Sequence, residues 1–204
     1  MATRKYEQRL RAEAAEETRR RILDAVYERL REDPSRPVSV DRVAQEAKVA
    51  RSTVYLIFGS RAGLFDALCQ DLFERAGYGR LIQAKELPDA RDHLRYGIRT
   101  GVEMYAAFRD VAHALYSMTA LDSEATGGAI QRTEDERSQG MARLAGRLAE
   151  QGHLRDGVDA EEAASLLWVL ASFASFDALY TDRGLPADEV VRVLTATAER
   201  TLLR

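Results

Sequence analysis

The residues best suited to chemistry lie between positions 39 and 61, where hydroxyls, guanidinium groups and one tyrosine follow each other closely. Arg51, Ser52 and Thr53 open a short run of apolar periodicity, and Tyr55 follows two residues later. A guanidinium can donate two parallel hydrogen bonds to a guanine edge or to a phosphate, and hydroxyls can donate to phosphate oxygens. This set therefore indicates contact with a nucleic acid. For Arg51, a guanine edge, a phosphate and plain solvation all remain open.

The elements that must position these side chains are two short helices joined by a tight turn, over residues 40–58. Ser39 precedes the first helix with a hydroxyl that can cap it, and Asp41 suits the positive end of its dipole. Ala44 lies in the middle of that helix, where a small side chain lets the second helix approach. This arrangement predicts a helix-turn-helix, whose second helix enters a DNA major groove. The apolar residues have the spacing that seats one helix across another, at Val40, Val43, Ala44, Ala47, Val49, Val54 and Ile57.

The end of this motif resembles a known family of regulators. The segment Thr53-Val54-Tyr55-Leu56-Ile57-Phe58-Gly59-Ser60-Arg61, followed by Leu64-Phe65-x-x-Leu68, resembles the TetR family of transcriptional repressors. That family carries a Thr-x-Tyr-x-x-Phe-x-x-basic pattern, preceded by a helix similar to Thr18-Arg19-x-x-Ile22-Leu23-x-Ala25 here. The resemblance spans about residues 18–70, and beyond residue 75 it concerns architecture alone.

The resemblance implies roles for single residues in DNA binding. Thr53 and Tyr55 match positions that hydrogen-bond phosphates, and Arg61 matches a basic residue that holds phosphate from the start of the next helix. Lys48 stands where glycine is usual, and a positive φ there costs about 1 kcal/mol. Ala50 replaces the usual capping serine or threonine, a loss of about 1 kcal/mol. The candidate DNA-contacting residues are Ser39, Arg42, Arg51, Ser52, Thr53, Tyr55 and Arg61.

Turn signals and apolar periodicity predict an all-α protein with two domains. We expect a disordered N-terminal arm at 1–17, with an arm that follows DNA as the alternative. A three-helix helix-turn-helix domain at 18–61 and a connecting helix at 62–77 follow. The resemblance assigns residues 78–204 to a helical domain for ligand binding and dimerisation. Helices in that domain are expected near 89–106, 108–121, 129–151, 160–180 and 187–203.

The segment 163–176 carries no charge, so it must be covered on most sides. It is shorter than the ~20 residues that span a membrane. Asp159 with Glu162 is typical of a capping box that opens this helix. The pattern favours burial against its own domain on one side and a partner subunit on the other, with simple core as the alternative. The candidate interface residues of a homodimer are Leu167, Leu170, Ala171, Phe173, Ala174, Val190 and Leu194.

A ligand pocket in the second domain is implied more by the resemblance than by residue spacing. Such a pocket would be apolar and aromatic with few polar groups. For any single aromatic residue, packing in the core is the simpler interpretation. The candidate ligand contacts are Tyr105, Phe108, Tyr116, Trp168 and Phe176, with His113 to orient a polar group of the ligand.

Charge and composition are compatible with a DNA-binding protein and give no support to an enzyme. The net charge of −3 is unevenly distributed, since residues 1–61 hold 14 basic and 10 acidic side chains while residues 62–204 hold 16 and 23. The three histidines lie on separate segments, without the spacing of metal or nucleophile motifs. The single cysteine, Cys69, allows no disulfide framework and fits a reducing cytoplasm. The mixed-charge N-terminus does not resemble a signal peptide.

These observations together predict a transcriptional regulator without cofactor or metal. We expect a homodimeric repressor that binds a palindromic operator and is released by a small, largely apolar effector, with no membrane partner. One alternative is a regulator of the same class that responds to no ligand. The other is an all-helical enzyme or carrier with a vestigial helix-turn-helix.

Overall fold

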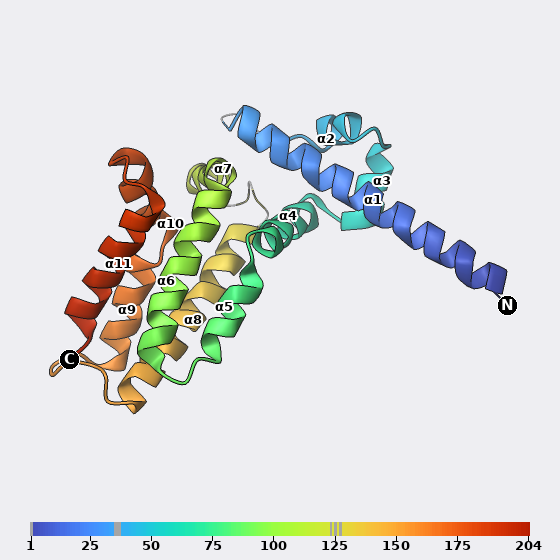
Figure 1. The fold of residues 1–204 in the computed structure, drawn as a ribbon. Helices are drawn as coiled ribbons and strands as arrows, with labels where there is room; N and C mark the ends of the chain where they lie inside the picture. Colours follow the sequence, from blue (N-terminus) through green and yellow to red (C-terminus); the bar gives the residue numbers. More distant parts are fainter. Residues whose placement is uncertain (1, 35–37, 123, 125, 127) are drawn as a thin grey trace. The chain divides into compact units, whose positions relative to one another are not determined.

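The computed structural model describes residues 2–34, 38–122, 124, 126 and 128–204, with the backbone alone for 2–5, 7 and 8. In this part of the chain the elements are helical, and the one β-type pairing is an isolated antiparallel bridge between Leu154 and Leu203. The prediction of an all-α fold is confirmed (Figure 1). Contacts divide the chain into two compact units: Met1–Asp71 with His113–Ile130, and Leu72–Ala112 with Gln131–Arg204.

The first unit is built on the apolar stripe of its long first helix, on which Ile22, Val26 and Leu30 recur at intervals of four residues and are at most 1% exposed. Leu64 and Phe65 complete this core with no exposed surface. The division of contacts assigns residues 62–71 and 113–130 to this unit, whereas the sequence placed a boundary after residue 61. The helices of the unit are α1 (Ala2–Glu32), α2 (Val40–Glu46), α3 (Arg51–Phe58), the greater part of α4 (Arg61–Arg75) and the C-terminal part of α7 (Arg109–Leu121).

Helix α1 begins at Ala2, so the expectation of a disordered arm at 1–17 and a helix starting at Thr18 is wrong. The arm lacks an apolar face, and the residues from 9 to 17 are exposed. It is nevertheless rich in alanine, glutamate and arginine, which have high intrinsic helix propensity. The pair between Arg9 and Glu13, at 3.4 Å, adds support one turn apart. The intrinsic helix propensity of these residues therefore extends α1, although their side chains are not buried.

The second unit packs α6 against α5 on one side and against α11 on the other, and α9 packs against α11, as Figure 1 shows in green, orange and red. Leu94, Leu148, Leu167, Phe176 and Leu202 are at most 1% exposed and form the centre of its core. Helix α5 was not predicted from the sequence. The helices are α5 (Tyr78–Lys85), α6 (Ala90–Ala107), most of α8 (Ala129–Glu150), α9 (Ala160–Leu170), α10 (Phe173–Asp177), a π-helical turn (Ala178–Asp182) and α11 (Ala187–Leu202).

The helix expected over 160–180 is interrupted, because α9 ends at Leu170 and α10 starts at Phe173 with a bend of 49°. Two serines account for the break. The Ser172 and Ser175 hydroxyls donate to the Val169 carbonyl at 2.7 and 2.6 Å, and Ser172 also accepts from the Ser175 amide. Serine side chains compete with the backbone in this way and end helices. The expected cap at Asp159 is confirmed, since its carboxylate accepts from two backbone amides of α9.

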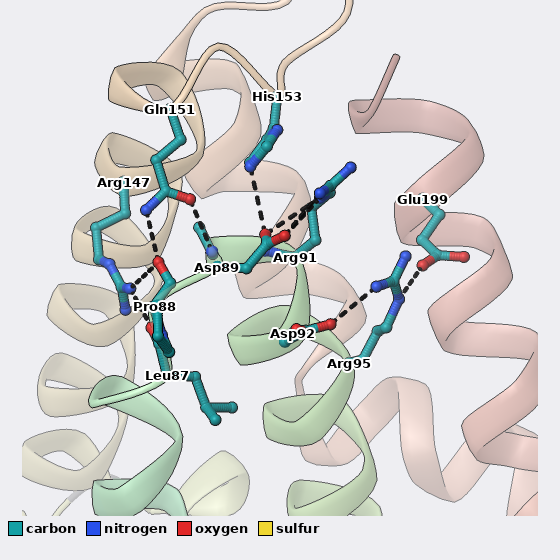
Figure 2. Close-up of polar contacts among 11 residues, drawn as sticks. Leu87, Pro88, Asp89, Arg91, Asp92, Arg95, Arg147, Gln151, His153 and Glu199 are labelled. Carbon is teal, nitrogen blue, oxygen red and sulfur yellow. Dashed lines mark hydrogen bonds and ion pairs between the residues drawn. The ribbon is translucent and has the colours of Figure 1, made fainter.

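A cluster of polar contacts fastens the loop before α6 to the C-terminal end of α8 (Figure 2). Arg147 donates to the carbonyls of Lys85, at 2.9 Å, and of Leu87, and Gln151 bridges the Pro88 carbonyl and the Ala90 amide. In the same loop Asp89 caps α6. Its hydrogen bonds with the Arg91 side chain and amide hold the pKa of this carboxyl well below its usual range.

His93 adds a pH dependence to this cluster. Burial, followed by the positive charge of Arg147 at 3.1 Å from its Nδ1, lowers the pKa of His93 to about 4, so the ring is neutral at pH 7. Below pH 6.5, His93 is protonated in the unfolded chain but stays neutral in the folded chain until about pH 4. The free energy of unfolding therefore falls between pH 6.5 and 4. Because the ring is only half-buried, solvent screening reduces the effect, and we expect a loss of about 1 kcal/mol from pH 7 to 5.

Urea unfolding followed by circular dichroism at pH 7 and pH 5 measures this loss. The matched control is His93→Gln, because glutamine does not titrate. The free energy of unfolding of this variant should depend less on pH. An equal loss of stability in the wild type and in His93→Gln would contradict the assignment to His93.

Candidate nucleic-acid interface and apolar cavity

The predicted helix-turn-helix is present at α2 and α3. Val43, Ala44 and Val54 are at most 3% exposed and pack the two helices together, as the apolar spacing predicts. Lys48 has the positive φ expected at the turn, 55°, and the Val49 amide donates to the Ala44 carbonyl at 2.9 Å. Ala50 occupies the N-cap position of α3 without a side-chain hydrogen bond, as its residue type requires. The turn is therefore built without glycine and without a hydroxyl cap.

One side of α3 is open to solvent, while the opposite side is buried through Val54 and Phe58. Thr53, next to this open side, is partly exposed. A guanidinium, hydroxyls and an apolar tip on one short helix suit base edges, phosphates and thymine methyl groups respectively. The open face consists of Arg51, Ser52, Tyr55 at 37% exposure and Leu56 at 85%.

Leu56 was missed as a functional candidate, because no role was assigned to this apolar residue within an apolar run. Its one available signal was its position: it follows Tyr55 directly and lies one turn after Ser52, on the same side of the helix.

Arg51 is held by two neighbours. Its Nη1 lies 3.0 Å from both carboxylate oxygens of Asp41, and its Nη2 donates weakly to the Tyr55 hydroxyl at 3.4 Å. The guanidinium also lies over the Tyr55 ring, 5.5 Å from the ring centre. The hydrogen bond to Tyr55 and then the charge of Asp41 raise the pKa of Arg51 above its ordinary value. The arginine is thus fully charged and oriented on the exposed face.

The remaining candidates lie around this face with different partners. Ser39 holds the N-cap position of α2, but its side chain makes no capping hydrogen bond, so the predicted cap is wrong. Arg42 is paired with Glu46 one turn on, at 3.2 Å. Arg61, partly exposed at the start of α4, lies over the Phe65 ring at 5.1 Å. The Ser60 hydroxyl caps α4, because it accepts a hydrogen bond from the Gly63 amide at 3.0 Å.

The second unit contains an apolar cavity at the break between α9 and α10. The space inside it that the centre of a water-sized sphere can occupy is small, about 20 Å³. Gly97 and Gly101, one turn apart on α6, leave one wall of the cavity without side chains. No atom lies within 4 Å of a Cβ built on Gly101. The remaining lining is formed by Ile98, Val102, Tyr105, Leu170, Ala171, Ser172, Phe176 and Leu194.

The cavity includes only part of the predicted ligand set. Tyr105 and Phe176 line it, at 5.6 Å between ring centres. Phe108 and Trp168 belong to the same unit but do not line it. His113 and Tyr116 belong to the other unit. The two glycines were not predicted from the sequence, and their spacing of four residues on an otherwise amphipathic helix was the available signal.

Four of the candidate dimer residues are buried within their own unit. Leu167, Phe173, Val190 and Leu194 are at most 5% exposed within their own unit, so their side chains have almost no surface left for a partner. Leu170, Ala171 and Leu194 instead line the cavity. Ala174 is exposed, as an interface residue would be.

The exposed apolar surface of α9 lies at two positions that were not in the predicted set. They are Trp168, 43% exposed beneath the Arg137 guanidinium, and Val169, 51% exposed.

Over the described residues, no group of three or more His, Cys, Asp or Glu side chains could hold a metal ion. No single helix there is long and apolar enough to cross a membrane, although the bent pair of 160–170 and 173–182 passes the same test by length and composition.

The fold and the exposed face of α3 define a class: a helical transcriptional regulator with a helix-turn-helix for DNA. Residues 22–68 match the model of the bacterial regulatory proteins of the tetR family. This stretch of the chain is therefore a DNA-binding domain of the TetR family, a family of transcriptional regulators and not of enzymes. No curated protein matches the sequence significantly.

Solved structures with the same fold extend the match over nearly the whole chain. NalD from Pseudomonas aeruginosa, the secondary repressor of the MexAB-OprM multidrug efflux pump, is 22% identical with a TM-score of 0.70, covering 94% of this chain and 98% of its own. A protein from Saccharomonospora viridis described as a transcriptional regulator, in complex with choline, is 22% identical with a TM-score of 0.68, covering 93% and 99%. A TetR-like regulator from Rhodococcus sp. RHA1 is 20% identical with a TM-score of 0.64, covering 90% and 94%.

Proposed function

We propose that this regulator is a repressor that binds a palindromic operator as a homodimer and is released by a small molecule. The observation that supports DNA reading best is the open face of α3, on which Arg51, Ser52, Tyr55 and Leu56 are exposed together. Arg51 takes a guanine edge, while Thr53, Tyr55 and Arg61 bind phosphates. Ser39 and Arg42 border the same duplex. Two such faces enter successive major grooves about 34–36 Å apart. The protein acts in the cytoplasm, where its buried Cys69 stays reduced.

The cavity of the second unit is the proposed effector site. Its lining is apolar apart from Ser172 and the Tyr105 hydroxyl, which suits a largely apolar ligand with one polar group. Among proteins of this fold, NalD is a repressor and the Saccharomonospora regulator binds choline, which supports a repressor that responds to a small molecule. An effector that prefers the DNA-incompetent state would lower operator affinity about 5–150-fold.

The proposed DNA binding is tested by selecting sequences from a random pool of duplexes with the whole protein. We expect an enriched palindrome whose two halves are protected from cleavage in footprinting, with half-site centres about one helical turn apart. Enrichment of no sequence, or of an asymmetric single site, would refute the palindromic operator.

The proposed effector site is tested at Gly101. Gly101→Ala should raise the free energy of unfolding by about 0.5–1 kcal/mol, because alanine restricts the unfolded chain and meets no atom within 4 Å. Gly101→Leu should fill the cavity. A compound that stabilises the wild type by about 2.7 kcal/mol at 100 times its dissociation constant should then give Gly101→Leu no stabilisation.

Thermal unfolding with a panel of small amphipathic molecules, choline among them, measures both effects. Equal stabilisation of the wild type and of Gly101→Leu by the same compound would place the effector elsewhere. A panel that stabilises neither protein would favour the ligand-independent regulator.

A further inference from the structure

The Asp41–Arg51 pair joins the two helices of the reading unit at their first turns. Asp41 lies in the first turn of α2, and Arg51 is the first residue of α3, ten positions later. Both carboxylate oxygens are 3.0 Å from the same nitrogen, Nη1. The two side chains are 65% and 59% exposed, so the pair lies in solvent on the face that would approach DNA.

An exposed ion pair of this kind contributes little to folding, since such pairs are worth about 0–1 kcal/mol. Its clearer effect is geometric. An unrestrained arginine side chain samples many rotamers and loses them when it binds a base. Asp41 fixes one end of the guanidinium, and the Tyr55 ring, 5.5 Å from the guanidinium carbon, supports its plane.

The contacts leave a usable edge on the guanidinium. Asp41 occupies Nη1, and the weak bond to the Tyr55 hydroxyl uses one hydrogen of Nη2. Over the residues that the structure describes, Nε and the second Nη2 hydrogen have no protein acceptor. In a guanidinium, Nε–H and the Nη2–H on the same side are parallel and match the O6 and N7 acceptors of guanine, so this edge is available when the Tyr55 hydroxyl takes the other Nη2 hydrogen.

We propose that Asp41 is a positioning residue that holds Arg51 ready to read a guanine, and so sets the sequence preference of the regulator at that base pair. The inference rests on the proposed function, since it requires that α3 reads DNA. The Asp41 carboxylate also weakens binding to DNA that lacks that guanine. Its negative charge is repelled by the DNA phosphates unless the Arg51 guanidinium remains between them. Asp41 thereby strengthens discrimination and not affinity in general.

A purely local role for Asp41 makes a different prediction. An acidic residue in the first turn of α2 interacts favourably with the helix dipole. If that were its whole effect, removing the carboxylate would loosen the reading unit and weaken binding to every duplex alike.

The test starts from the palindrome selected by the wild-type protein. Each base pair of the half-site is replaced in turn, in both halves, and the position whose guanine preference is lost in Arg51→Ala is identified. At that position, Asp41→Ala and Asp41→Asn should reduce the ratio of affinities for guanine and adenine duplexes about three- to tenfold. Binding to a shuffled duplex should stay equal or become slightly tighter. In the Arg51→Ala background, Asp41→Ala should leave the ratio unchanged.

Glu46→Gln is the matched control, because it removes one negative charge from the same helix and leaves the Arg51 contacts intact. It should leave the guanine ratio unchanged. Circular dichroism of each variant checks that the exposed substitutions leave the fold intact.

Two outcomes would overturn the proposal and remain distinguishable. A proportional loss of affinity for guanine, adenine and shuffled duplexes in Asp41→Ala would leave Asp41 with a local role only, and the proposed function would stand. If the wild type selects no sequence, or if Arg51→Ala keeps every guanine preference, the proposed reading of DNA by Arg51 fails and the positioning role fails with it.

Discussion

Val169→Glu should convert the protein to monomers and lower its operator affinity by at least about 100-fold. Val169 is 51% exposed on α9 and neighbours the exposed Trp168, so these residues form the apolar surface that a partner subunit would cover. A charge buried there without a partner opposes association. Two linked reading units bind two half-sites about 10²–10⁴-fold more tightly than one, and a monomer loses that advantage.

Sedimentation velocity and the mobility shift of the selected duplex measure the two effects of Val169→Glu. Leu121→Glu is the matched control, since Leu121 is an even more exposed apolar residue, on α7 in the other unit. It should leave both the dimer and the operator affinity intact. Dimers of Val169→Glu at micromolar concentration would contradict this interface.

Arg51→Ala and Arg61→Ala should weaken DNA binding in two different patterns. Removing Arg51 should cost about 1–3 kcal/mol on the selected operator, a 5–150-fold loss, and should erase the guanine preference at one position of each half-site. Removing Arg61 should weaken all duplexes by a similar factor and reduce the slope of log affinity against log salt by about 1 per subunit. The two substitutions should differ in this way because Arg51 is proposed to contact a base and Arg61 a phosphate.

Fluorescence anisotropy with the operator, single-base variants and a shuffled duplex separates the two patterns. Tyr55→Phe should resemble Arg61→Ala, with an added small loss of preference because its hydroxyl accepts from Arg51. Identical losses across all duplexes for Arg51→Ala would remove it as a base reader.

The reading unit could be predicted from the sequence because its determinants are local. The spacing from Val40 to Phe58 fixes two helices, and the positive φ of Lys48 and the uncapped Ala50 follow from residue types at known positions of the motif. Within this unit, the cap predicted at Ser39 was wrong. A hydroxyl at an N-cap position can bond the backbone or remain in solvent, and the sequence does not distinguish the two. The pair between Asp41 and Arg51 joins residues ten apart, beyond any helical periodicity.

The second unit was predicted less well because its faces are set by packing between distant segments. An uncharged segment such as 163–176 must be covered, but the sequence does not say by what. Leu167 and Phe173 turned out to pack inside their own unit, while Trp168 and Val169 face solvent. The cavity lies at the break at 171–172, where two serines bond the Val169 carbonyl, and small polar residues in an apolar run gave only a weak signal of that break.

The central claim, that the face of α3 reads a duplex sequence, is tested most directly by titrating the wild-type protein with its selected duplex and with a shuffled duplex at 50–200 mM salt. We expect the selected duplex to bind at least about 10³-fold more tightly, and both affinities to fall steeply as salt rises. Equal affinity for the two duplexes, or affinity that does not change with salt, would contradict it.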